Sequence, residues 1–131
     1  MSSPSIEQLN RSSISAWNEN AQSWDDHMGR EGNDVYRVLE LPALEKLVKL
    51  TPGEHALDLA TGNGLVSRWL ASIGGIVIGT DASEAMLEIA KQRSPEGLSN
   101  KISYLLLDVT KEAQLEELIL HCEKVLKLDA R

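Results

Sequence analysis

Three short apolar runs, each followed by a turn and a helix-like segment, constrain the fold of this chain more than any other feature. The apolar runs cover residues 55–60, 76–80 and 102–107. Helical spacing of apolar residues follows at 65–73, 84–93 and 111–128. A strand–helix unit repeated three times predicts a parallel sheet with right-handed crossover helices. We therefore expect an α/β fold with three layers.

The chain before the first strand divides into two segments. Residues 1–13 are polar and rich in serine, and we expect them to form a flexible tail, with a frayed helical turn as the alternative. Residues 14–50 show helical spacing interrupted by glycines, which predicts an N-terminal helical cap. Trp17 and Trp24 share one face of this cap, a pattern that favours core packing over the alternative of a substrate cage. The sheet domain then occupies residues 51–131.

The charge balance excludes several classes of partner. Thirteen Lys and Arg against twenty Asp and Glu give a net charge of -7, whereas nucleic acid and anionic membranes bind clustered positive charge. No apolar stretch approaches the ~20 residues of a membrane span, and no secretory signal is visible. The single cysteine, Cys122, fits a reducing compartment. We expect a cytoplasmic protein that binds no nucleic acid and no membrane.

Each predicted strand ends in residues suited to a polar ligand, and ligands of parallel sheets bind outside the carboxyl ends of the strands. The first strand contains Asp58 and runs into a turn with Gly62 and Gly64, where the backbone can approach a ligand closely. The second is followed by Asp81, seventeen residues after Gly64, a spacing at which a carboxylate can accept both ribose hydroxyls. The third is followed by Asp108, placed to meet an adenine edge.

These residues also have purely structural alternatives. The two glycines could form only a tight strand-to-helix turn. Asp81 and Asp108 could each cap the helix that follows, and Asp58 could bond only loop amides. The presence of such residues at all three strand ends favours the ligand-binding interpretation.

The ligand that fits all three loops carries adenine, ribose and a cationic end. A dinucleotide fingerprint, G-x-G-x-x-G, would need glycine at position 67, where this chain has Ser67. Asp58 would also place a negative charge beside a pyrophosphate, whereas it favours an ammonium group. S-adenosylmethionine has all three parts, and a nicotinamide-binding domain is the weaker alternative.

Three segments resemble the motifs of class I S-adenosylmethionine-dependent methyltransferases, a Rossmann-like family. ALDLATGNG is similar to the glycine-rich motif, VIGTDASEAMLEIAKQR to the motif with the ribose-binding acid, and ISYLLLDVT to the motif whose acid receives the adenine amino group. The resemblance covers roughly residues 14–110 and includes a cap like that of small-molecule methyltransferases. It implies S-adenosylmethionine as cofactor and a small-molecule methyl acceptor. The cofactor-binding residues that it implies are Asp58, Ala60, Gly62, Gly64, Asp81, Ala82, Met86, Asp108 and Val109.

The sequence departs from this family pattern in two respects. Many members have glycine where this chain has Ala60, whose methyl group would crowd the methionine end of the cofactor, and often cysteine where it has Thr61. The family sheet has seven strands in the order 3-2-1-4-5-7-6, whereas residues 119–131 of this chain continue as helix. This implies a Rossmann-like sheet truncated after the third strand and its helix, the cofactor-binding portion of an enzyme.

Two functional hypotheses follow. The first is a methyltransferase acting on a small molecule, and the alternative is a non-catalytic truncated remnant that binds the cofactor or a partner. We assign no catalytic residue, because methyl transfer depends mainly on positioning and desolvation, and no His/Cys cluster has metal-ligand spacing. The open edge of the first strand favours self-association or pairing with another chain. We expect the isolated chain to lack methyl transfer.

Overall fold

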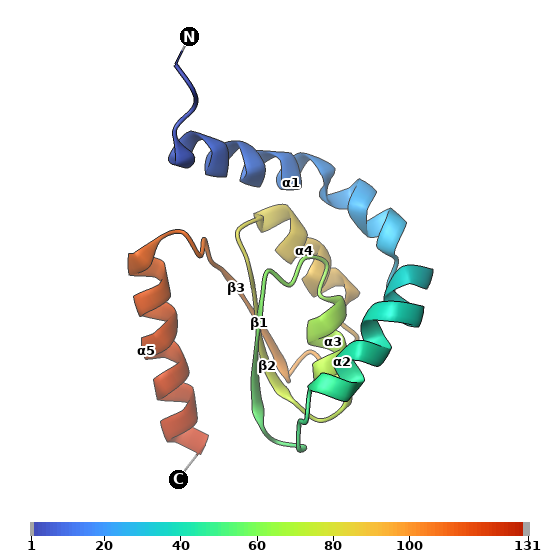
Figure 1. The fold of residues 1–131 in the computed structure, drawn as a ribbon. Helices are drawn as coiled ribbons and strands as arrows, with labels where there is room; N and C mark the ends of the chain where they lie inside the picture. Colours follow the sequence, from blue (N-terminus) through green and yellow to red (C-terminus); the bar gives the residue numbers. More distant parts are fainter. Residues whose placement is uncertain (1, 130–131) are drawn as a thin grey trace.

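The computed structural model describes residues 2–129, and its centre is a three-stranded parallel sheet (Figure 1). The strands are β1 (His55–Leu59), β2 (Ile76–Asp81) and β3 (Ile102–Leu106), in the order β1-β2-β3. In the register of the sheet, Ile78 of β2 lies between Leu57 of β1 and Ser103 of β3. The predicted parallel α/β sheet is confirmed.

Six helical segments surround this sheet. They are α1 (Ile6–Met28), the π-helical turn η1 (Tyr36–Glu40), α2 (Leu41–Leu47), α3 (Leu65–Ser72), α4 (Glu84–Arg93) and α5 (Glu112–Asp129). Helices α3 and α4 pack on one face of the sheet and α5 lies on the other (Figure 1), because right-handed crossovers in one direction place their helices on one side. Within residues 2–129, none of these helices is both long and apolar enough to cross a membrane.

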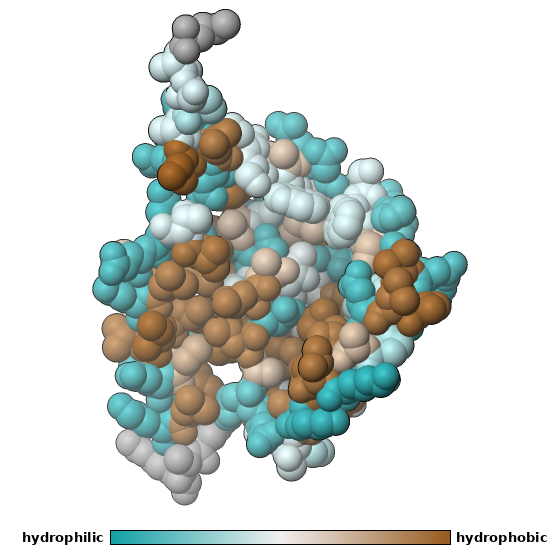
Figure 2. Space-filling model, viewed as in Figure 1, coloured by the Kyte–Doolittle hydropathy of each residue, from teal (hydrophilic) through white to brown (hydrophobic). Residues whose placement is uncertain are grey.

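The two faces of the sheet are packed to different extents. On the α3 face, Leu70, Ala71, Val77 and Ile102 form a buried cluster. On the α5 face, an apolar cavity of about 250 Å³ separates β1 and β2 from the helix, and its lining includes Leu57, which is 45% exposed. Figure 2 shows hydrophobic side chains gathered over α5 and the adjoining sheet. The outer edge of β1 has no partner strand within residues 2–129.

Helix α1 begins earlier than we predicted. It starts at Ile6, inside the segment 1–13 that we expected to be a flexible tail. The cause is a capping box: the Ser5 hydroxyl accepts a hydrogen bond from the Gln8 amide at 3.1 Å, and the Gln8 side chain accepts one from the Ser5 amide at 2.7 Å. This pair satisfies amide donors that a helix start otherwise leaves exposed. The tail prediction is therefore wrong for residues 6–13.

A buried carboxylate fixes α1 to the rest of the molecule. Asp25 is 2% exposed, and it accepts hydrogen bonds from Arg93 of α4 at 2.7 and 3.2 Å and from Asn63 Nδ2 at 3.0 Å. Burial alone would raise the pKa of Asp25, but the hydrogen bonds from Arg93 and Asn63 and the nearby guanidinium charges outweigh it, so that the pKa lies below its usual value. Asp25 therefore remains ionised at neutral pH.

Replacing Asp25 by alanine is expected to lower the free energy of unfolding by about 1–3 kcal/mol. The substitution leaves Arg93 and Asn63 without their acceptor, and the partial exposure of Arg93 keeps the loss below that of a fully buried pair. Asp26→Ala is the matched control, because Asp26 is exposed and its carboxylate accepts a hydrogen bond from Gln22 of the same helix. Urea denaturation of both variants tests this, and equal losses would contradict it.

The contribution of Asp25 is also expected to depend on pH. A carboxylate whose pKa is lower in the folded chain than its ordinary value of 3.8 stabilises the fold above that pH. The contribution is lost as the pH falls through the folded pKa. The difference in unfolding free energy between the wild type and Asp25→Ala should therefore be constant near neutrality and shrink below about pH 4.

Candidate functional site

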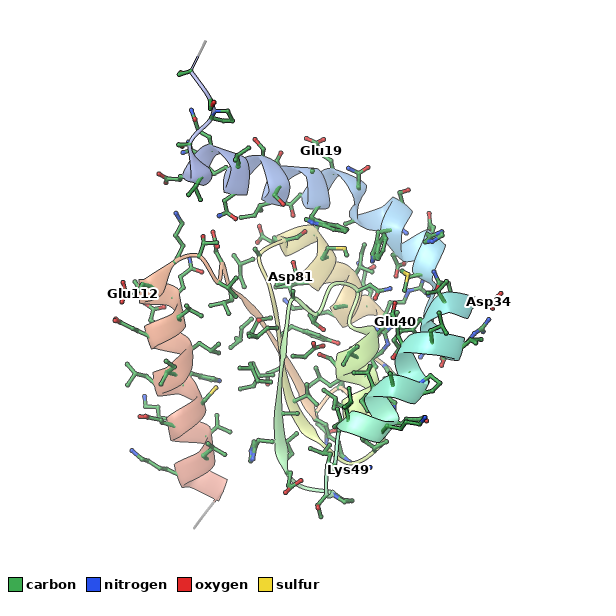
Figure 3. All side chains as sticks on the ribbon, viewed as in Figure 1. Glu19, Asp34, Glu40, Lys49, Asp81 and Glu112 are labelled. Carbon is green, nitrogen blue, oxygen red and sulfur yellow. The ribbon has the colours of Figure 1, made fainter. Side chains whose placement is uncertain are left out.

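A cavity of about 340 Å³ lies at the carboxyl ends of the strands, beneath α1. We call it the strand-end cavity. Its lining comes from α1 and from all three loops that follow the strands, and Asp81, labelled in Figure 3, lies below α1 at this end of the sheet. The lining residues are Asn10, Trp17, Trp24, Ala60, Gly62, Asp81, Ala82, Met86, Leu107, Asp108, Val109 and Thr110.

The loop after β1 contains three residues with left-handed backbone, and each has a different environment. A Cβ at Gly64 would lie 2.6 Å from the Tyr104 hydroxyl, so this glycine is required by packing. A Cβ at Gly62 would meet only Met86 Cε, at 3.4 Å, and would enter the strand-end cavity. Ala60 has φ 59°, a conformation that costs a residue with a Cβ about 1–2 kcal/mol. This backbone accounts for the glycine that the family pattern has there.

The carboxylate of Asp81 joins the first loop to the second. Its Oδ2 accepts from the Gly62 amide and its Oδ1 from the Ser83 amide, both at 2.9 Å. Ser83 itself is the N-cap of α4, because its hydroxyl accepts from the Met86 amide at 3.1 Å. Asp81 is thus not the capping residue of α4, and it presents its carboxylate at the cavity wall.

The carboxylate of Asp108 is held from two sides in the third loop. Its Oδ1 accepts from the Thr110 amide at 3.0 Å and from the Thr110 hydroxyl at 2.6 Å, and its Oδ2 accepts from Asn10 Nδ2 at 2.9 Å. The Thr110 hydroxyl is the main cause that holds the pKa of Asp108 below its usual value, against the opposing effect of burial. Asp108 is therefore an ionised acceptor at neutral pH.

Two predicted residues do not line the cavity. Gly64 is turned into the packed interior, as described above. Asp58 accepts from the Thr61 hydroxyl at 2.7 Å and from the Ser67 hydroxyl at 2.8 Å, behind the glycine-rich loop. Ser67 is the residue that occupies the last glycine position of a dinucleotide fingerprint, and here its side chain is fully buried and fixes the loop.

Helix α1 supplies three residues of the cavity lining, of which the sequence indicated Trp17 and Trp24 but not Asn10. Trp17 and Trp24 stack edge to face with ring centroids 5.6 Å apart, and they line the strand-end cavity. The prediction that they pack in the core is wrong, since they are 44% and 39% exposed. The sequence does not indicate Asn10, because this residue falls in the segment 1–13 that we expect to be a tail. The capping box at Ser5 and Gln8 is the signal that would have placed it on a helix.

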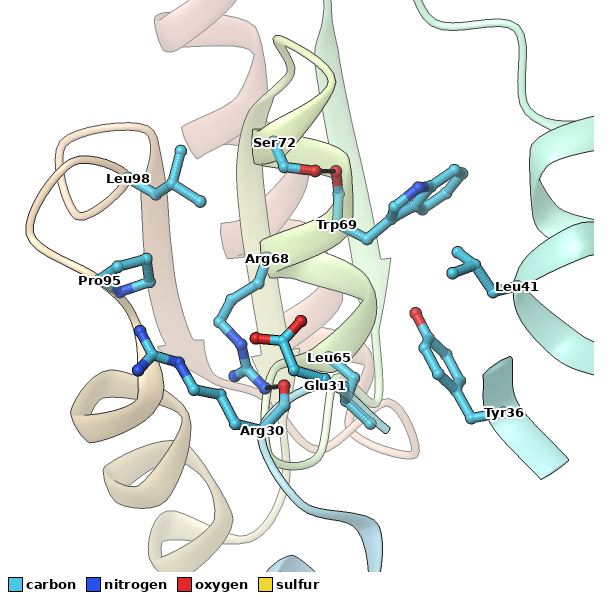
Figure 4. A pocket seen from close by; sticks show the side chains of 10 residues that line it. All are labelled: Arg30, Glu31, Tyr36, Leu41, Leu65, Arg68, Trp69, Ser72, Pro95 and Leu98. Atoms are coloured by element: carbon cyan, nitrogen blue, oxygen red, sulfur yellow. Dashed lines mark hydrogen bonds between the residues drawn. The ribbon is translucent and has the colours of Figure 1, made fainter. Parts of the chain in front are cut away.

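A second cavity, of about 290 Å³, lies outside α3 and holds none of the predicted residues (Figure 4). Arg68 crosses it, and its guanidinium donates to the backbone carbonyls of Asn63 and Arg30, the latter at 2.9 Å. Arg68 thereby ties the loop after α1 to the glycine-rich loop. Within residues 2–129, no three His, Cys, Asp or Glu side chains are grouped to hold a metal ion.

Comparison with known sequences places this geometry in a family. Residues 56–127 match a family described as a methyltransferase domain. The chain is 31% identical over 120 residues to a ubiquinone biosynthesis O-methyltransferase of Coxiella burnetii, covering 88% of this chain and 50% of the relative. It is 33% identical over 84 residues to a magnesium-protoporphyrin O-methyltransferase of Rhodobacter capsulatus, covering 64% of this chain and 36% of the relative. The chain thus spans about half the length, or less, of these curated relatives.

Solved structures agree with this assignment. A SAM-dependent methyltransferase from Anabaena variabilis superposes with a TM-score of 0.61 at 28% identity, covering 90% of this chain and 46% of that one. A phosphoethanolamine N-methyltransferase of Haemonchus contortus, solved with S-adenosylhomocysteine, shares the fold with a TM-score of 0.63 at 21% identity, covering 80% of this chain and 22% of that one. With three strand-end loops converging on one cavity and the family match over more than half of its length, this chain belongs to the class I S-adenosylmethionine-dependent methyltransferases.

Proposed function

We propose that this chain is the cofactor-binding portion of a small-molecule methyltransferase and that S-adenosylmethionine binds in the strand-end cavity. The observation that carries the proposal is the convergence of two hydrogen-bonded carboxylates, Asp81 and Asp108, with the open backbone at Gly62 in one cavity. The lone Cys122 fits the reducing cytoplasm, where we infer that the protein works.

The chemistry of the lining fits this cofactor. Met86, Leu107 and Val109 provide apolar surface for a nucleobase, and the two carboxylates provide acceptors for hydroxyl and amino hydrogens. Gly62 has no Cβ, which leaves room for the methionyl end of the cofactor to approach the loop. When bound, the cofactor supplies a methyl group activated by the positive sulfonium.

Six of the predicted residues then have defined tasks. Asp81 accepts the two ribose hydroxyls, and Asp108 accepts a hydrogen of the adenine amino group, which Val109 flanks. Asp58 lies behind the loop and attracts the ammonium group indirectly, by ordering the loop through its hydrogen bonds with Thr61 and Ser67. Ala82 and Met86 form the floor under the nucleoside.

The methyl acceptor is proposed by class only. The relatives named above are methyltransferases of ubiquinone biosynthesis and of magnesium-protoporphyrin, and we infer a small organic acceptor for this chain as well. Trp17 and Trp24 form the cavity wall, where they restrict the entry of water. Acceleration of methyl transfer arises largely from such positioning and desolvation, so that no residue of this chain is assigned as a base.

Replacing Gly62 by alanine is expected to weaken S-adenosylhomocysteine binding by about tenfold or more while leaving the fold intact. The added methyl group enters the cavity, and steric exclusion of even a small group costs over a kcal/mol. Gly53→Ala is the matched control: Gly53 also has a positive φ, its Cβ would meet nothing within 4 Å, and it lies in the distant turn before β1. Both variants should lose a similar unfolding free energy, of about 1–2 kcal/mol. Calorimetric titration showing equal affinity for the two would oppose the assignment of the cavity.

Asp81→Asn is expected to weaken binding of S-adenosylmethionine by about 1–3 kcal/mol, because the charged acceptor of two hydroxyls is lost. Asp34→Asn provides the control, since Asp34 is an exposed carboxylate that pairs with Arg37 and does not line the cavity. Titration calorimetry measures both, and NAD at the same concentration should give no heat of binding. Unchanged affinity in the Asp81 variant would remove the ribose assignment, and binding of NAD alone would reverse the choice of cofactor.

We further propose that a second copy of the chain pairs with the open edge of β1. Unpaired strand edges are templates for association, and Leu57 and Leu59 beside this edge are 45% and 50% exposed. Leu59→Lys should therefore lower the average mass in sedimentation velocity at high protein concentration, because a charge at an edge opposes pairing. Leu47→Lys, on the 78% exposed Leu47 of α2, should leave the mass unchanged. A wild type that stays monomeric at all concentrations would contradict the proposal.

A further inference from the structure

Helix α1 contacts all three strand-end loops through three polar side chains. Asn10, Asn18 and Asp25 are spaced by eight and seven residues, which places them within about 80° of one another around a helix of 3.6 residues per turn. Each bonds a different loop: Asp25 bonds Asn63 of the first, Asn18 bonds the second, and Asn10 bonds the third. One face of α1 thus spans the strand-end cavity and is bonded to the loop after each strand.

The contact of Asn18 holds α1 in place without touching a carboxylate. Its Oδ1 accepts from the Ser83 hydroxyl at 2.7 Å and from the Ala85 amide at 3.2 Å, at the start of α4. Asn18 does not line the cavity. Loss of its side chain should therefore loosen α1 without altering the polar groups that face a ligand.

The contact of Asn10 differs, because it acts on Asp108 itself. Asn10 lines the cavity, and its Nδ2 donates to Asp108 Oδ2 at 2.9 Å and to Thr110 Oγ1 at 3.1 Å. An ionised carboxylate offers about four acceptor positions. Three of those of Asp108 are taken, two by Thr110 on Oδ1 and one by Asn10 on Oδ2.

The remaining acceptor position is on Oδ2, the oxygen that Asn10 orients. A single free position with a fixed direction suits one N–H donor of a planar amino group and rejects a carbonyl oxygen, whose lone pairs it would repel. Removal of the Asn10 amide would leave Oδ2 free to hydrate or turn, so that the acceptor loses its direction.

We propose that Asn10 is a specificity-determining residue that aligns Asp108 for the 6-amino group of the adenine of the cofactor. The proposal rests on the proposed function above, because it takes the strand-end cavity as the cofactor site. In this proposal α1 does more than cover the site. Through Asn10, the helix helps to distinguish an adenosyl ligand from the corresponding ligand with a 6-oxo base.

The test compares two ligands, S-adenosylhomocysteine and S-inosylhomocysteine, by titration calorimetry. The wild type should bind the adenosyl ligand about tenfold or more tightly, since a charged acceptor facing an oxygen costs over a kcal/mol. Asn10→Ala should weaken the adenosyl ligand about fivefold and the inosyl ligand by less than twofold, which reduces the discrimination. Asn10→Asp keeps the shape of the side chain, loses the donor and adds a like charge, and it should reduce the discrimination further.

Two variants separate base recognition from a general loosening of α1. Asn18→Ala should weaken both ligands by the same factor and preserve the discrimination. Asn20 is exposed, does not line the strand-end cavity, and donates within its own helix to the carbonyl of Ala16, so Asn20→Ala should change neither affinity. Equal weakening of both ligands in the Asn10 variants, or no change, would overturn the proposal while leaving the cofactor site intact. A wild type that binds neither ligand would overturn the proposed function together with it.

Discussion

The buried carboxylate of Asp25 is the interaction on which the site depends, because it joins three segments that are distant in sequence. It is almost fully buried, so the Arg93 guanidinium and the Asn63 amide are needed as partners to stabilise its charge. Asn63 stands between Gly62 and Gly64 in the loop after β1. The loop thus uses the Asn63 side chain to bind the helix above it, while the adjacent Gly62 lines the cavity without a side chain. The hydrogen bonds of Asp25 therefore fix both the position of α1 and the loop that lines the strand-end cavity.

The sheet and its loops could be predicted from sequence because their signals are local. Apolar runs of strand length, the turn at Gly62 and an acid after each strand lie within a few residues of one another, and the parallel topology then brings them to one edge. The start of α1 also has a local signal, the capping box of Ser5 and Gln8. This signal is obscured because the serines around it give the segment the composition of a flexible tail.

The residues that could not be predicted act across long distances in the chain. Asn10 meets Asp108 across 98 positions and Asn18 meets Ser83 across 65, and no periodicity marks such a pair. The spacing of Trp17 and Trp24 correctly indicates a shared helix face. Spacing says which side chains lie together but not whether a core or a cavity covers them, and here it is a cavity.

The same limit applies to α5, whose apolar pattern predicted a helix without predicting how it packs. In the family pattern a fourth strand lies beside the first, whereas β1 has no partner on that side within residues 2–129. Ile119 and Leu120 of α5 are 58% and 62% exposed, and an apolar cavity lies between the helix and the sheet. Apolar surface therefore stays exposed on the α5 side of the sheet, in contrast to the packed α3 side.

Three acids at one end of a small sheet would repel one another if they were left bare. Each is instead held by donors from the chain: Asp58 by two hydroxyls, Asp81 by two amides, and Asp108 by an amide, a hydroxyl and Asn10. These donors offset the repulsion but add no net charge, so the edge stays negative. A diphosphate would add to that charge, whereas a ligand with a sulfonium and an ammonium group reduces it. The electrostatics of the loops thus favour the same ligand as the shape of the cavity does.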